Sequence, residues 1–173
     1  LRYSWDGDVL WDFIFSDSLY MQHHDIEPMP NGNVLLVSWE VKFPDEVSAA
    51  GRLGQEITMW PDMIVEIEPE GMYGGNIVWE WHFWDHLVQD VDSSLSNYGI
   101  VSDHPALIDI NKVEINDNSP SGDWNHINAI DYNGITDLPS YLFDRLNSGS
   151  QDVSKETALA WEKWSGSVVS FSF

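Results

Sequence analysis

The chain contains no cysteine. This absence excludes disulfide bonds, thiol catalysis and zinc sites built on cysteine. Cations are also scarce, with seven Lys and Arg against 29 Asp and Glu and a formal net charge of −22. Nucleic acids and anionic membrane surfaces bind clustered cations, so we exclude both as partners. The acidity mainly favours solubility and suits a salty external medium.

Long apolar runs are also absent, since no window approaches the roughly 18 residues of a membrane span. The sequence has no Gly-x-Ser-x-Gly elbow, no phosphate loop, no dinucleotide fingerprint and no His-Glu-x-x-His zinc motif. It begins at Leu1 rather than Met, which we interpret as a processed or incomplete chain. No signal peptide is visible, and a removed one would leave no trace. The missing cysteine is compatible with an extracellular or periplasmic bacterial protein.

Apolar and aromatic residues are plentiful, at 43% hydrophobic content with ten Trp in 173 residues. Such a chain is long enough for one domain, or for part of a larger one. Two turn signals between apolar segments predict β-hairpins, Asp6-Gly7 within residues 1–16 and Asn31-Gly32 within residues 23–39. Alternation predicts further strands at 63–68 and 76–83, with a helical turn at 84–90. Residues 42–61 and 91–122 are predicted to be loops.

A weak repeat supports a propeller. Gly7-Asp8-Val9-Leu10-Trp11-Asp12-Phe13 matches Gly75-Asn76-Ile77-Val78-Trp79-Glu80-Trp81. Blocks of short strands that recur in this way are typical of propeller blades, which stack because one blade cannot cover its own faces. We predict an all-β fold, a partial β-propeller of about two blades over residues 1–133. Exposed blade edges would favour self-association.

Residues 134–173 depart from this pattern and form a divergent C-terminal segment. Stretches 138–146 and 153–164 look more helical than extended, and residues 167–173 alternate as a short strand.

The stretch Trp124-Asn125-His126-Ile127-Asn128 has strand periodicity. A strand places Trp124, His126 and Asn128 in one row on one face, where they offer a flat apolar surface, a titratable nitrogen and an amide. Such a row suits an aromatic anion. The alternative is a polar edge strand whose His is only hydrogen-bonded, and on this stretch alone the alternative is favoured.

Metal binding is not predicted. His23 and His24 are adjacent, so in a strand they point to opposite faces and cannot chelate together. The acidic stretches lack the spacing and central Gly of an EF-hand. A calcium ion in the acid-rich loop 109–123 stays open as an alternative.

Several motifs together resemble the bacterial arylsulfotransferases, which use no nucleotide sulfate donor. The motifs are His23-His24-Asp25 with Pro30-Asn31-Gly32-Asn33-Val34-Leu35, Gly75-Asn76-Ile77-Val78-Trp79-Glu80-Trp81, Asp85-His86-Leu87-Val88-Gln89-Asp90, and Asp123-Trp124-Asn125-His126-Ile127-Asn128. They follow the family's order over about residues 1–133. The resemblance implies a six-bladed propeller in a secreted or periplasmic protein, which transfers a sulfuryl group between phenols through a sulfated His.

The resemblance also implies site residues. His24 and His126 are the expected catalytic pair, which assists the sulfuryl group rather than attacking it. The expected substrate-binding residues are Asn128, Trp124, Asp25 and His23. We expect an aromatic sulfate and a phenol as partners, with no cofactor. The family's Arg and nucleophilic His are not identifiable, because Arg145 lies in unmatched surroundings and no His follows His126.

Two functions therefore fit the sequence. The chain is a fragment or divergent member of the arylsulfotransferases, active only if the missing blades are supplied. The alternative is a non-catalytic extracellular module, derived from a propeller, with a binding or structural role.

Overall fold

The structure is a computed structural model that describes residues 1–54, 56–111, 122–133 and 138–143. The chain divides into two compact units. Unit 1 comprises Leu1–Glu40, Asp62–His82 and Ile127–Leu142, and unit 2 comprises Val41–Pro61, Phe83–His126 and Phe143–Phe173. Each unit combines three segments that lie far apart in the sequence, so neither unit corresponds to one continuous stretch of the chain.

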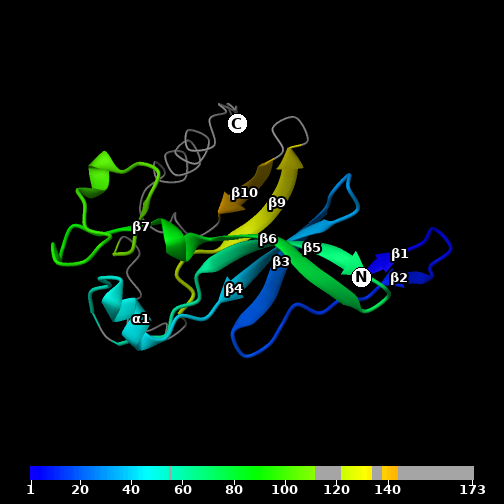
Figure 1. The fold of residues 1–173 in the computed structure, drawn as a ribbon, viewed down its shortest axis with the longest axis horizontal. Coiled ribbons are helices and arrows are strands. Elements are labelled where there is room, and N and C mark those ends of the chain that lie inside the picture. The colour runs from blue at the N-terminus through cyan, green and yellow to red at the C-terminus, as the bar shows by residue number, and fades with distance from the viewer. Residues whose placement is uncertain (55, 112–121, 134–137, 144–173) are drawn as a thin grey trace. The chain divides into compact units, whose positions relative to one another are not determined.

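Unit 1 is built on a four-stranded antiparallel sheet (Figure 1). Its strands follow one another in the order β3 (Tyr20–Pro28), β4 (Val34–Glu40), β5 (Asp62–Glu70) and β6 (Gly74–His82). The hairpin predicted from Asn31-Gly32 is confirmed, with Gly32 at φ +93°, a backbone conformation that costs glycine little. The strand predicted at 63–68 is confirmed within β5, and the strand predicted at 76–83 is confirmed over residues 76–82 of β6.

Both faces of this sheet are buried at its centre. One face carries Val34 and Leu36 of β4 and Met63, Val65 and Ile67 of β5, packed with Trp11. Alternation sends the intervening residues to the opposite face, where Leu35, Val37 and Ile64 are also buried. Strands covered on both sides read as continuous apolar runs, which explains the sequence Val34-Leu35-Leu36-Val37.

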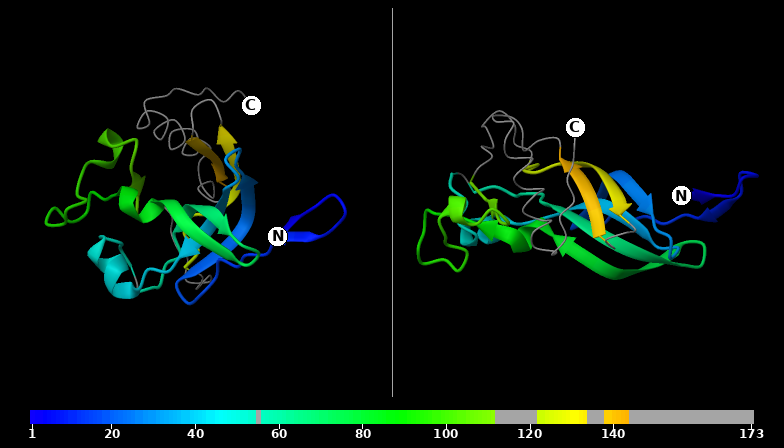
Figure 2. Two further views of the ribbon diagram at one scale, coloured as in Figure 1. Left: turned by 45° about the vertical axis from the view of Figure 1, so that its right-hand side comes forward. Right: turned by 90° about the horizontal axis from the view of Figure 1, so that it is seen from above.

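The N-terminal hairpin is short and projects away from the sheet (Figure 2). It pairs β1 (Arg2–Tyr3) with β2 (Val9–Trp11) across the predicted Asp6-Gly7 turn. The Trp11 indole Nε1 donates to the Gly74 carbonyl oxygen over 2.8 Å, which anchors the hairpin to the start of β6.

The last described strands are β9 (Ile127–Asn133) and β10 (Leu138–Phe143), which pair with each other, and β9 lies against β3. The helical prediction for residues 138–146 is therefore wrong over 138–143. Tertiary pairing overrides a weak helical periodicity in so short a segment. The predicted helix at 153–164 and the strand at 167–173 lie outside the described residues.

Unit 2 consists of short elements. They are α1 (Pro44–Ala49), η1 (Phe83–His86), β7 (Leu87–Val88), η2 (Val101–Asp103) and β8 (Ile108–Asp109). Helix α1 corrects the loop prediction for 42–61: Pro44 opens it, and the Phe43 amide donates to the Glu46 carboxylate over 2.8 Å. The predicted helical turn at 84–90 is present as η1.

Buried Gln89 organises the long loop of unit 2. Its side-chain oxygen accepts the amides of Val91 and Asp92, and its side-chain nitrogen donates to the Asp92 carbonyl oxygen. The described part of the predicted loop 91–122 is thus an ordered, hydrogen-bonded structure.

The prediction of a β-rich fold is confirmed, with one four-stranded sheet in the described residues. The described strands do not establish a second blade. The two copies of the weak repeat lie in different settings, one in the β2 hairpin and one in the outer strand β6. No helix in the described part of the chain is long and apolar enough to cross a membrane.

Candidate functional site

A bulge in β3 brings the two adjacent histidines together. The register between β3 and β4 shifts between Gln22 and Ile26, and His24 within that shift has φ 51°. The rings of His23 and His24 lie 5.2 Å apart, edge to face at 68°. The expectation that they point to opposite faces is therefore wrong, because the bulge interrupts the two-residue period of the strand.

His23 is the buried member of the pair, at 8% exposure. Its Nε2 lies 2.9 Å from Oδ1 of Asp62, and its ring stacks on Trp39 with centroids 4.1 Å apart. Trp39 and Asp62 are directly paired in the β4–β5 register. With Asp62 ionised, its carboxylate can only accept this hydrogen bond, and His23 Nε2 is then the donor.

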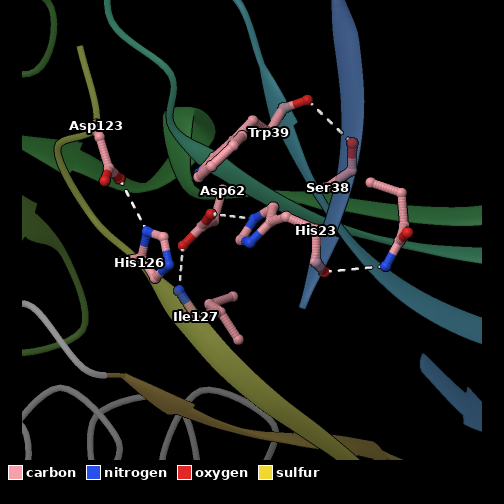
Figure 3. Close-up of polar contacts among 8 residues, drawn as sticks. His23, Ser38, Trp39, Asp62, Asp123, His126 and Ile127 are labelled. Carbon is pink, nitrogen blue, oxygen red and sulfur yellow. Dashed lines mark hydrogen bonds and ion pairs between the residues drawn. The ribbon is translucent and has the colours of Figure 1, made fainter. Parts of the chain in front are cut away.

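Two carboxylates of unit 1 bind the backbone of β9. Oδ2 of Asp62 accepts the Ile127 amide over 2.6 Å, and Oδ2 of Asp25 accepts the Ile130 amide over 3.0 Å. The other Asp25 oxygen accepts the amide of Ile26. Figure 3 shows Asp62 between His23 and Ile127, with one oxygen directed to each. The predicted role of Asp25 in substrate binding stays a prediction, since both its oxygens contact backbone amides.

The predicted row of Trp124, His126 and Asn128 does not form on one strand, because β9 begins only at Ile127. His126 Nδ1 lies 3.0 Å from Oδ1 of Asp123, three residues earlier, as Figure 3 also shows. Such a local side-chain bond favours a turn over an extended strand. Trp124 is fully buried and His126 is 9% exposed, both in unit 2, whereas Asn128 is half-buried in unit 1.

An apolar hollow of about 270 Å³ lies in unit 1, lined by side chains that include Trp11, Phe13 and Phe15. Val34 and Leu36 also line it. Along β4 these two residues alternate with Trp39, which stacks on His23. The hollow and the His23–Asp62 pair are therefore on opposite faces of the sheet.

Unit 1 contains little permanent positive charge. Arg2 is the sole Lys or Arg in its three segments, and its guanidinium donates to the Gly32 carbonyl oxygen over 3.3 Å. An anion bound at the His23–His24 bulge would thus depend on the histidines and on backbone amides.

The arylsulfotransferase family model matches residues 2–139. The chain belongs to the arylsulfotransferase family. No curated protein and no solved structure matches the chain. The resemblance noted over residues 1–133 is thereby confirmed.

Three residues that contact the candidate histidines were missed from sequence. Asp62 and Trp39 contact His23, and Asp123 contacts His126. Asp62 carries a weak signal, because it directly precedes the apolar run Met63-Ile64-Val65, and an acidic residue that becomes buried there needs a partner. Nothing in the sequence pairs it with His23, which lies 39 residues away.

The alternative of a calcium ion in loop 109–123 falls mostly outside the described residues, which omit 112–121. Within the described part, the Asp109 carboxylate accepts the Asn111 amide over 2.8 Å, and Asn111 donates to the Gly51 carbonyl oxygen. These bonds link the loop to the end of α1.

Proposed function

We propose that this arylsulfotransferase-family chain binds an aryl sulfate at the His23–His24 bulge and takes part in transferring its sulfuryl group to a phenol. The observation that carries the proposal is the bulge itself, in which an exposed His24 ring rests against a buried, carboxylate-bound His23. A non-glycine residue at positive φ is uncommon, and bulges of this kind occur next to active sites, where they redirect a side chain.

The chemistry requires such groups. A sulfate ester carries one negative charge shared by three oxygens, and hydrogen-bond donors must stabilise that charge as the S–O bond breaks. In the proposed reaction a neutral imidazole attacks sulfur, the S–O bond to the donor phenol breaks, and a second, protonated imidazole gives its proton to the departing phenolate. The oxygen of the acceptor phenol then attacks sulfur, its proton passes to the now neutral second imidazole, and the N–S bond breaks to release the attacking His.

We assign the assisting roles to His24 and to His126. His24 is exposed at the bulge, and its neighbour His23 is held by Asp62. His126 is oriented through Nδ1 by Asp123, which leaves its Nε2 as the nitrogen directed away from that carboxylate. The attacking His is not among these assignments, and no His follows His126 in the sequence. Trp124, Asn128 and Asp25 remain the proposed substrate-binding residues.

The second candidate is a non-catalytic binding module outside the cytoplasm. The absence of a His after His126 favours it, because the family resemblance expects the nucleophile there. Under either candidate, we propose a secreted or periplasmic location. We also propose an aryl sulfate and a phenol as partners.

A chromogenic assay separates the two. The purified chain is given nitrophenyl sulfate with a phenol acceptor, and released nitrophenolate is followed by absorbance. Once the missing blades are supplied, we expect turnover that His24→Ala and His126→Ala each abolish, whereas His104→Ala, a change at an exposed histidine of unit 2, leaves it intact. Turnover that survives both substitutions would eliminate the proposed site. Binding of nitrophenyl sulfate without turnover, in a folded chain, would favour the binding module.

A further inference from the structure

Asp62 is a fully buried carboxylate for which the family resemblance provided no role. It is 0% exposed at the start of β5 and forms hydrogen bonds with His23 through Oδ1 and with the Ile127 amide through Oδ2. A buried carboxylate is costly unless its oxygens are hydrogen-bonded. These bonds satisfy it, and they also join two segments that lie far apart in sequence.

The two joined segments are those that carry the proposed histidines. Through Oδ1, Asp62 holds His23 at the bulge, where the His23 ring contacts the ring of His24. Through Oδ2, it holds the backbone of Ile127, the residue bonded directly to His126 in the chain. One side chain thus bonds to both the bulge of β3 and the first residue of β9.

An ionised Asp62 also favours the tautomer of His23 that carries its proton on Nε2, because a carboxylate can only accept this bond. The stack on Trp39 supports the same orientation of the ring. A ring held in one tautomer and one orientation presents a constant edge to His24. This arrangement matches a general pattern in which a carboxylate orients an imidazole that serves a reaction.

We infer that Asp62 is a positioning residue of the site: it acts through His23 on His24 and through Ile127 on the start of β9. The expected effect of Asp62 on kcat rests on the proposed function. Its expected effects on the hydrogen bonds of His23 and of the Ile127 amide do not, because these can be measured in the chain without substrate.

The decisive variant is Asp62→Asn, which keeps the size of the side chain and removes its charge. The amide offers one oxygen where the carboxylate offers two, so it cannot accept from both His23 and Ile127 in the same way. Asp62→Glu restores the charge at a longer reach. Glu68→Gln is the matched control, because Glu68 is exposed on the same strand and also loses one negative charge.

We expect Asp62→Asn to lower kcat for nitrophenyl sulfate by roughly 10–100-fold, the range typical for loss of an orienting partner, with KM near the wild-type value. The imidazole N–H proton signal of His23 should disappear from the NMR spectrum, and amide exchange at Ile127 should accelerate. Asp62→Glu should recover part of kcat and of the His23 signal. Glu68→Gln should change none of these.

A folded Asp62→Asn variant with wild-type kcat would overturn the inference, even if Ile127 exchanged faster, because Asp62 would then be structural only. If the wild-type chain shows no turnover, the proposed function fails by itself. In that case an unchanged His23 signal together with unchanged Ile127 exchange in Asp62→Asn overturns the inference, and loss of the His23 signal or faster Ile127 exchange supports it.

Discussion

The imidazole rings of His23 and His24 lie 5.2 Å apart, although the two residues are neighbours in one strand. In a regular strand their side chains would leave opposite faces of the sheet. The bulge at Gln22–Ile26 and the positive φ of His24 remove that restriction. This local distortion creates the pair on which the proposed site depends, and it costs stability.

The positive φ of His24 predicts that glycine at this position is more stabilising than alanine. At φ 51° a residue with a Cβ is disfavoured by roughly 1–2 kcal/mol per residue, whereas glycine is not. We expect His24→Gly to be more stable than His24→Ala by about 1 kcal/mol in urea denaturation. Both variants should lose nitrophenyl sulfate turnover, because neither retains the imidazole.

The comparison between these two variants is the control, since both lose the ring contact with His23. If His24→Gly is equal to or less stable than His24→Ala, the left-handed backbone at the bulge is not a real source of strain in solution.

A pH dependence is predicted for unit 2. Burial lowers the pKa of His86 from its ordinary value of 6.5, and the charge of Asp85 only partly opposes this shift. Below pH 6.5 the His86 imidazole is protonated in the unfolded chain but stays neutral in the folded chain. The free energy of unfolding therefore falls as pH falls toward the lowered pKa of folded His86. Above the unfolded pKa both states are neutral at this position, and the effect vanishes.

We expect His86→Gln to reduce the loss of stability between about pH 7.5 and about pH 5.5, the interval in which an ordinary His titrates. The measurement is the urea midpoint at the two pH values. His104→Gln, at an exposed histidine, is the comparison and should leave the pH dependence unaltered. An equal pH dependence in wild type and His86→Gln would contradict the prediction.

The exposed edge of strand β6 leads us to predict self-association. Among the described residues it pairs with β5 on one side and with no strand on the other, and Ile77 and Val78 are 48% and 50% exposed. An exposed apolar edge strand is a template for pairing with another chain. We propose that two copies associate through β6, in keeping with the self-association expected from sequence.

Val78→Lys places a charge on this edge, and burying that charge in a dimer is costly. Sedimentation velocity should show that the wild-type chain associates. In Val78→Lys the dissociation constant of the dimer should rise roughly tenfold or more, since each 1.4 kcal/mol corresponds to about a factor of ten. Val91→Lys adds the same charge at an equally exposed valine of unit 2 and should not weaken association. A wild-type chain that stays monomeric at all concentrations would refute the proposal.

Much of unit 1 was predictable because its signals are local. Asn31-Gly32 specified the β3–β4 turn through the positive φ that glycine tolerates, and the apolar runs specified β4 and β5. The helical reading of 138–146 failed over β10 because its periodicity was weak and strand pairing with β9 decided the outcome. The motif from Asp123 to Asn128 was recognised, but its strand begins three residues later than its alternation suggested.

By itself, the sequence determined that this chain is β-rich, acidic and without cysteine, and that it belongs to the arylsulfotransferase family, because composition, turn residues and motif order are read along the chain. Only the tertiary structure decided that His23 and His24 face each other, that Trp39 stacks on His23, and that Asp62 holds His23 and Ile127 together. These contacts join β3, β4, β5 and β9. Their geometry depends on a strand bulge and on a register between strands, neither of which a local pattern encodes.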